Sequence, residues 1–149
     1  VNTSSAVQPQ LQAAFDRFKS NAFVAGDDAA TGLSKLVVSV QSNPDLQLGV
    51  DESYSLAIPV QGNIELIAPT VYGAYHGLTS LMQLIQYDFD ALDYYIPFAP
   101  WTIKDAPRYP HRELLVDTSR HFEPVVALEH IIDSMTMAKL NVLHWHIID

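Results

Sequence analysis

Two apolar segments near the C-terminal end of the chain each run into polar residues, and their spacing constrains the fold most. The first, ELLVD (113–117), leads into TSRH, and the second, NVLHWHI (141–147), leads to Asp149. Between them, apolar residues recur at helical spacing from Leu128 to Ala138. The two predicted strands start about 28 residues apart, which is the length of one βαβ unit. We therefore expect two parallel, neighbouring strands joined by a right-handed crossover.

The polar residues that follow these strands form a candidate ligand site. In parallel α/β folds, ligands bind at the carboxyl ends of the strands, because the loops there are free to carry polar side chains. Asp117, Arg120 and His121 lie just past the first strand, and Asp149 lies at the tip of the second. A guanidinium offers a rigid fork of donors for vicinal hydroxyls or a carboxylate. We predict that Arg120 binds substrate and that Asp149 orients a histidine or holds a hydroxyl.

The HWH triplet in the second strand allows a different hypothesis. His144 and His146 are two residues apart and point the same way, so they are a plausible first half of a metal site in a metal-dependent barrel hydrolase. However, they precede the strand tip, and the sequence shows no second cluster of ligands. We favour core histidines hydrogen-bonded within a barrel, with Trp145 packing on the opposite face. No metal site is expected. His76 and His130 are expected on solvated helix surfaces.

The first half of the chain predicts a helix-and-sheet layer that reaches roughly residue 90. Apolar residues at helical spacing predict a helix at 8–20 and a second helix after Thr70. Alternating apolar and polar residues predict strands at 35–42, 52–60 and 64–69, and the QGN turn predicts that the last two of these form a hairpin. Thr70 is the predicted N-cap of that helix. Gly73 and Gly77 lie four residues apart on it, so we expect a close approach there, most simply by the backbone of a strand.

A proline-rich stretch with several aromatic residues separates the two halves. Prolines at 97, 100, 107 and 110 predict an extended, packed connector, in which Tyr94, Tyr95 and Trp101 are packing residues. We place the domain boundary within it, giving domains at 1–105 and 106–149. Two strands and one helix cannot close a barrel, so the chain is expected to be the front of a larger enzyme or a trimmed part of one.

Composition excludes several other classes of protein. The chain is 48% hydrophobic with a formal charge of −9, which indicates a packed core and disfavours nucleic acid as a partner. No apolar run has the length of a membrane span, and the N-terminus lacks a signal pattern. The absence of cysteine excludes disulfides and thiolate metal sites. Asn2 opens an NTS triplet, a glycosylation sequon of a kind that also arises by chance.

Two motifs carry a resemblance to a known family. PRYPHRELLVDTSRHFEP (107–124) followed by MAKLNVLHWHIID (137–149) resembles the start of the catalytic barrel in glycoside hydrolase family 20, the β-N-acetylhexosaminidases. The upstream ESYSLAI and IELIAPTVYGAYHGLTSLMQLI resemble the α/β (zincin-like) domain that precedes this barrel. The resemblance covers residues from roughly 33 to 149. It departs at Glu113, where the family usually has glycine.

This resemblance implies an α/β fold, with a small helix-and-sheet domain followed by the incomplete start of a (β/α)₈ TIM barrel. It implies an exo-acting, retaining glycosidase that uses the acetamido oxygen of its substrate as nucleophile and forms an oxazolinium. Arg120 matches the arginine that binds ring hydroxyls in the −1 subsite, and Asp149 matches the aspartate that supports the catalytic acid through a later histidine. Arg112 and Asp117 match positions that brace the first strand. The Asp-Glu catalytic pair is expected outside this chain, so the chain alone is expected to be inactive.

The resemblance also implies the surroundings of the activity. The expected substrates are oligosaccharides or glycans ending in N-acetylglucosamine or N-acetylgalactosamine, no cofactor is expected, and the expected location is secreted or lysosomal. A homodimer formed through the full-length barrel is also compatible with the resemblance. A non-catalytic carbohydrate-binding fragment is the other alternative. Such a module folds alone, whereas residues 106–149 should expose the unpaired edge of an unfinished sheet.

Overall fold

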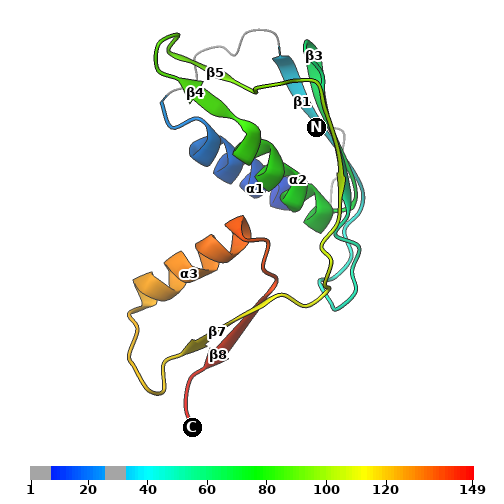
Figure 1. The fold of residues 1–149 in the computed structure, drawn as a ribbon. Coiled ribbons are helices and arrows are strands. Elements are labelled where there is room, and N and C mark those ends of the chain that lie inside the picture. Colours follow the sequence, from blue (N-terminus) through cyan, green and yellow to red (C-terminus); the bar gives the residue numbers. More distant parts are fainter. Residues whose placement is uncertain (1–7, 26–32) are drawn as a thin grey trace. The chain divides into compact units, whose positions relative to one another are not determined.

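The computed structural model describes residues 8–25 and 33–149, and the chain divides into two compact units. Unit 1 is Val1–Pro107 and unit 2 is Arg108–Asp149 (Figure 1). Among the described residues, unit 1 has two helices, a four-stranded sheet and a two-stranded sheet, and unit 2 has one helix and a two-stranded sheet. No helix in the described ranges is long and apolar enough to span a membrane.

Unit 1 is built on a four-stranded sheet with strand order β1-β3-β2-β6. Its helices and strands are α1 Gln8–Ala22, β1 Leu33–Ser42, β2 Tyr54–Ile58, β3 Gly62–Thr70, α2 Val71–Leu84, β4 Gln86–Asp88, β5 Asp93–Tyr95 and β6 Trp101–Asp105. β1 is parallel to β3, and β2 is antiparallel to both β3 and β6. The predicted helices, the strands and the β2–β3 hairpin are therefore confirmed.

The expected extended connector is wrong in part, because it contains strands. β5 pairs with β4 in an antiparallel hairpin, and β6 joins the main sheet as the edge strand beside β2. Trp101 begins β6 directly after Pro100, and its indole Nε1 donates to the carbonyl oxygen of Pro97 at 2.8 Å. An edge strand needs hydrogen bonds on one side only, so a proline directly before it does not interrupt the ladder.

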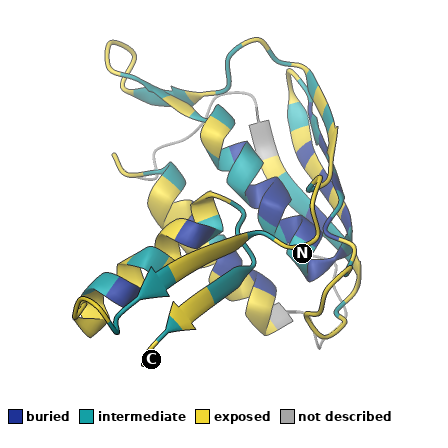
Figure 2. Ribbon diagram, turned by 60° about the horizontal axis from the view of Figure 1, so that its bottom comes forward, coloured by how far each residue is buried: buried dark blue, intermediate teal, exposed yellow. Residues whose placement is uncertain are grey.

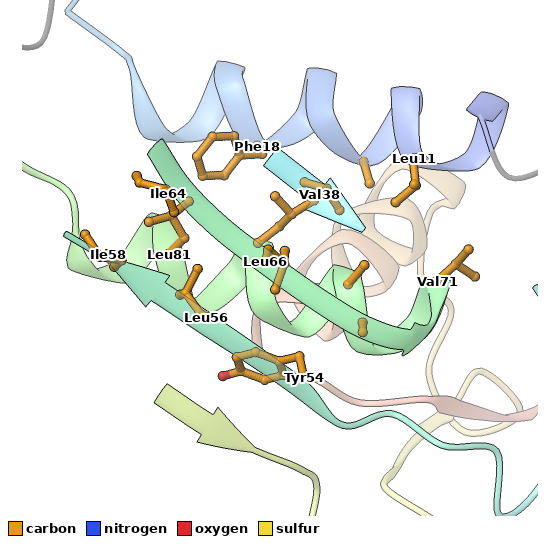
Figure 3. Packing of buried hydrophobic residues seen from close by; sticks show 14 residues of the cluster. Leu11, Phe18, Val38, Tyr54, Leu56, Ile58, Ile64, Leu66, Val71 and Leu81 are labelled. Carbon is orange, nitrogen blue, oxygen red and sulfur yellow. The ribbon is translucent and has the colours of Figure 1, made fainter. Parts of the chain in front are cut away.

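The core of unit 1 lies between the sheet and the two helices (Figure 3). In β3, alternate residues Ile64, Leu66 and Ala68 are buried, as the period of a half-covered strand requires. α1 contributes three buried residues and α2 several more, and Figure 2 shows the buried positions of α2 in dark blue. Full burial of one such aliphatic side chain contributes about 1.5–3 kcal/mol, so this layer stabilises unit 1.

Helix α2 begins at the residue that the sequence predicts, and its two glycines let it lie close to the segment before β2 and to β3. Thr70 is the N-cap, and its Oγ1 accepts from the N–H of Gly73 at 3.4 Å. A Cβ placed on Gly73 would collide with the backbone carbonyl of Ser53, just before β2, and one on Gly77 would collide with the Leu66 side chain of β3. The expected close approach is confirmed, by backbone at the first glycine and by a side chain at the second.

His76 was expected on a solvated helix surface, and this expectation is wrong. Its residue is only 8% exposed, and its Nε2 lies 3.0 Å from Oε1 of Glu52, which is 7% exposed. The cause is the segment before β2, whose backbone at Ser53 lies directly against Gly73 and covers this side of α2. A buried carboxylate requires a partner, and the imidazole supplies it.

Unit 2 is a single βαβ unit, made of β7 Glu113–Asp117, α3 Val125–Met137 and β8 Val142–His146. β7 and β8 pair in parallel from Glu113 opposite Val142 to Asp117 opposite His146. The predicted parallel strands and intervening helix are confirmed. The two strands contain exposed and intermediate residues only, coloured yellow and teal in Figure 2, whereas parallel sheets are usually covered on both faces.

Arg112 ties the start of β7 to the turn that leads into β8. Its Nε donates to the carbonyl oxygen of Lys139 at 2.7 Å, and its Nη1 donates to that of Tyr109 at 2.8 Å. Its backbone N–H donates to Oδ1 of Asn141 at 2.9 Å. Arg112 therefore holds the amino end of β7 against the turn before β8 through both its side chain and its backbone.

Candidate functional site

The carboxyl ends of β7 and β8 bring four polar side chains together. Asp117 and His146 are the last residues of the two strands and are register partners, so their side chains lie on the same face of the sheet. Arg120 follows β7 by three residues, and Asp149 follows β8 by three. We call Asp117, Arg120, His146 and Asp149 the strand-end cluster.

Asp117 fixes both the main chain and the side chain of Arg120. Its Oδ1 accepts from the backbone N–H of Ser119 at 2.9 Å and from that of Arg120 at 3.2 Å, which closes the turn after β7. Its Oδ2 accepts from Arg120 Nη1 at 3.2 Å. Partial burial opposes ionisation, but these N–H donors and the guanidinium hold the pKa of Asp117 below its ordinary value. The carboxylate is therefore charged at neutral pH.

Asp149 joins the arginine to the histidine. Its Oδ1 lies 2.8 Å from Arg120 Nη1 and 2.8 Å from His146 Nε2. His146 Nε2 must carry a hydrogen to donate to the Asp149 carboxylate. Arg120 Nη1 and His146 Nε2, which lie 3.4 Å apart, are then two donors that share Asp149 Oδ1 as their acceptor. The Arg120 side chain is 53% exposed. Exposed ion pairs contribute only about 0–1 kcal/mol to stability, so these contacts chiefly orient the guanidinium.

A second pair of contacts holds the turn after β7 against β8. The backbone N–H of Thr118 donates to the carbonyl oxygen of His146 at 3.0 Å, which continues the parallel ladder by one bond. The indole Nε1 of Trp145 donates to Thr118 Oγ1 at 2.9 Å. The turn that carries Arg120 is therefore attached to the neighbouring strand by main-chain and side-chain hydrogen bonds.

The structure brings together Arg120 and Asp149, the two site residues that the sequence predicts, and adds two more to them. Asp117 is among the polar residues expected just past the first strand, and the resemblance assigns it to bracing that strand; in the structure it also contacts the arginine directly. His146 was expected in a core, but its side chain is 32% exposed and bound to Asp149. Its position opposite Asp117, at the end of its own strand, is the signal that could have identified it. His121, next to the arginine, is exposed.

The two histidines of the HWH triplet bind different carboxylates. His144 Nδ1 lies 3.0 Å from Oε1 of Glu113, and the other oxygen of Glu113 lies 2.9 Å from Nε2 of His111. These hydrogen bonds, first with His111 and then with His144, hold the pKa of Glu113 below its ordinary value. In the part of the chain that the structure describes, no group of three or more acidic or histidine residues could hold a metal ion. Asn2 lies outside the described residues.

Comparison with known proteins places both units in one family. Residues 1–84 match the family described as beta-acetyl hexosaminidase like, and residues 109–149 match the catalytic domain of glycosyl hydrolase family 20. The chain belongs to the β-N-acetylhexosaminidases of glycosyl hydrolase family 20. The strand-end cluster thus lies entirely within the segment that matches the family 20 catalytic domain.

Individual relatives of family 20 agree with this membership. The chain is 40% identical to beta-hexosaminidase 1 of Arabidopsis thaliana, with 93% of the chain and 29% of that protein aligned. It is 41% identical to beta-hexosaminidase subunit B2 of Dictyostelium discoideum, with 93% of the chain and 26% of that protein aligned. The solved chitobiase of Flavobacterium johnsoniae superimposes with a TM-score of 0.78 at 31% identity, over 92% of the chain and 22% of that structure. The chain thus spans less than a third of the length of these proteins.

Proposed function

We propose that the whole protein is an exo-acting, retaining β-N-acetylhexosaminidase and that Arg120 binds the terminal sugar in its −1 subsite. The observation that carries this proposal is the guanidinium held between Asp117 and Asp149 at the carboxyl ends of two parallel strands. This is the end of a parallel α/β sheet at which ligands bind. Membership in family 20 supplies the class of substrate, a terminal N-acetylglucosamine or N-acetylgalactosamine.

The hydrogen bonding of Arg120 suits it to bind vicinal hydroxyls. Within the described residues, its side-chain hydrogen bonds and ion pairs use Nη1. The Nε and Nη2 donors remain for a ligand, and the two carboxylates fix the plane of the fork before the ligand arrives. Such preorganisation lowers the entropic cost of binding and keeps the sugar ring oriented for reaction. A lysine would offer a point charge without this fork.

Asp149 is proposed to have a second role at the site, that of orienting neighbouring side chains. Its carboxylate is shared between Arg120 and His146, so it restrains two side chains with one group. The family resemblance assigns this aspartate to a histidine further along the chain, which supports the catalytic acid. The 2.8 Å contact between Asp149 Oδ1 and His146 Nε2 supports this role, because it places an imidazole against the same carboxylate within unit 2. We propose that Asp149 orients basic side chains around the reacting sugar.

The chemistry proposed is substrate-assisted. The acetamido oxygen of the bound sugar attacks the anomeric carbon, the glycosidic oxygen leaves with a proton from a glutamic acid, and an oxazolinium forms. Water then opens this intermediate with net retention of configuration. The aspartate that orients the acetamido group and the glutamic acid are proposed to lie on a later strand of the complete barrel. We therefore propose that these 149 residues bind and orient the sugar but do not hydrolyse it alone.

The exposed strands of unit 2 argue against a self-contained binding module. Apolar Leu115 and Trp145 are 52% and 45% exposed, on opposite faces of a sheet that has only two strands. Both strands therefore have an unpaired edge. Strands with free edges and uncovered faces are a liability in an independent domain. We propose that β7, α3 and β8 form the opening unit of a (β/α)₈ barrel, and that the whole protein is secreted or lysosomal.

Substitution of Arg120 tests the proposed function. In the protein expressed from its complete gene, Arg120→Ala should lower kcat/KM on an aryl N-acetyl-β-D-glucosaminide by about a hundredfold, because each hydrogen bond to a charged group contributes about 1.5–3 kcal/mol. Arg120→Lys should recover only part of this loss. Arg108→Ala removes an exposed arginine whose guanidinium lies over the neighbouring Tyr109 ring, and it is the matched control. Equal activity of the Arg120→Ala and Arg108→Ala enzymes would refute the assignment.

A further inference from the structure

Arg120 lies on a loop that is held at its start. The loop runs from Thr118 to Pro124, between β7 and α3, and its residues from Arg120 onward are exposed. On the β7 side, Asp117 Oδ1 accepts from the backbone N–H of Arg120 at 3.2 Å, which is the upper end of the usual range for such a bond. The position of the guanidinium therefore depends on how firmly the first residues of this loop are held.

Thr118, the first residue of the loop, is held by two neighbouring residues of β8. Its backbone N–H donates to the carbonyl oxygen of His146 at 3.0 Å. Its Oγ1 accepts from the indole Nε1 of Trp145 at 2.9 Å and donates to the carbonyl oxygen of His146 at 3.4 Å. The hydroxyl of Thr118 therefore uses both its donor and an acceptor position toward β8.

Trp145 reaches the loop from the face of the sheet opposite to Asp117. Side chains alternate along a strand, so Trp145 and His146 point to opposite faces, and His146 shares its face with Asp117, its register partner. The indole is rigid and has a single N–H to donate. That N–H meets the residue directly after Asp117, so the two side chains hold the same turn from two faces.

We propose that Trp145 is a positioning residue for the sugar-binding arginine and that it acts through the hydroxyl of Thr118. The indole holds Thr118 against β8, Thr118 fixes the start of the loop, and the loop presents the fork of Arg120 to the hydroxyls of the terminal sugar. This inference rests on the proposed function and adds to it a residue that does not itself contact the substrate. The sequence predicts Trp145 as a packing residue, and packing alone does not require its N–H to meet the loop.

Steady-state kinetics on an aryl N-acetyl-β-D-glucosaminide test this proposal in the protein expressed from its complete gene. Thr118→Val keeps the shape of the side chain and removes the hydroxyl, so it should raise KM about fivefold and change kcat by less than about twofold. Thr118→Ser retains the hydroxyl and should keep KM within about twofold of the unaltered enzyme. A merely structural contact would lower the folded fraction, and with it the apparent kcat, without raising KM.

A double-mutant cycle tests whether Trp145 is the partner through which Thr118 acts. Trp145→Phe keeps a large aromatic side chain and removes the N–H donor, so it should also raise KM about fivefold. Because both substitutions remove one shared hydrogen bond, KM of the double variant should lie within about twofold of either single variant. Thr102→Val makes the same change at an exposed position of β6, and as the matched control it should leave KM unchanged.

Two results would overturn the proposal, namely equal KM values for Thr118→Val and Thr102→Val, or effects of Thr118→Val and Trp145→Phe that multiply in the double variant. If Trp145→Phe does not fold, the comparison of Thr118→Val with Thr118→Ser decides alone. Arg120→Ala in the same assay separates this inference from the proposed function. Impaired Arg120→Ala beside unimpaired Thr118→Val would overturn the positioning role alone, whereas an unimpaired Arg120→Ala enzyme would overturn both.

Discussion

The carboxylate of Asp117 accepts hydrogen bonds both from the backbone of the turn after β7 and from the side chain of Arg120. Oδ1 closes the turn through two backbone N–H groups, and Oδ2 holds the guanidinium of Arg120. An asparagine would retain one oxygen for the turn, but its amide nitrogen could not accept from Nη1. Asp117→Asn should therefore leave the fold intact and lower kcat/KM about tenfold by releasing Arg120. Asp133→Asn, at an exposed position of α3, controls for the loss of a charge, and an equal effect of both would contradict this role.

The same carboxylate predicts a pH dependence of stability. The pKa of Asp117 is lower in the folded chain than its ordinary value of about 3.9, so its ionised form stabilises the fold. This contribution is fully present above pH about 4 to 5 and is lost as the pH falls through the folded pKa. Urea unfolding of the unaltered and Asp117→Asn proteins should show a small, constant difference in the free energy of unfolding at pH 6–8. The difference should shrink at pH 3, and a difference that grew at pH 3 would contradict the account.

At the scale of elements, the glycines of α2 decide how closely the helix approaches the sheet. Alanine normally stabilises a helix interior by about 1 kcal/mol over glycine. Gly73→Ala should instead destabilise unit 1 by about 1–3 kcal/mol, because its Cβ would collide with the backbone carbonyl of Ser53, which cannot move without displacing β2. Gln83→Ala, at an exposed position of the same helix, should be nearly neutral. Thermal or urea unfolding measures both, and a more stable Gly73→Ala protein would refute the close approach.

Sequence periodicity predicted the long elements well because each buries one clear face. The alternation in β3 and the helical face of α2 both correspond to buried residues in the structure. β6 was missed because it is only five residues long, lies at the edge of the sheet and directly follows a proline, although Trp101 and Ile103 alternate with exposed Thr102 and Lys104. The burial of His76 was missed because it depends on the segment at Ser53, which covers α2. Helical periodicity cannot show which segment covers a helix.

The strand-end cluster shows how far the same reasoning reaches toward a site. The rule that ligands meet the carboxyl ends of parallel strands pointed to Asp117, Arg120, His121 and Asp149, and the resemblance to the family motif then singled out Arg120 and Asp149. It did not select His146, because the contact of His146 with both residues depends on the exact register of β7 and β8. That register, and the hydrogen bonds of Arg112 at the other end of the strands, cannot be read from the sequence.

At the scale of the whole molecule, binding and bond cleavage are expected to belong to different parts of the enzyme. The 149 residues contain the strand-end cluster but span only 29% of beta-hexosaminidase 1 of Arabidopsis thaliana. We predict that the isolated 149-residue chain does not release aryl alcohol from an aryl N-acetyl-β-D-glucosaminide, whereas the product of the complete gene does. Turnover by the isolated chain, at an intact mass of 16.6 kDa, would require a catalytic acid within it and would contradict the proposal.

The central claim is a retaining hexosaminidase in which the acetamido group of the substrate is the nucleophile. The most direct measurement compares kcat/KM of the complete gene product on two aryl glycosides, the N-acetyl-β-D-glucosaminide and the β-D-glucoside. The account predicts a preference of at least about a thousandfold for the acetamido sugar, because a well-placed intramolecular nucleophile contributes that much and more. Comparable turnover of the two substrates would mean that the nucleophile belongs to the protein, and would contradict the account.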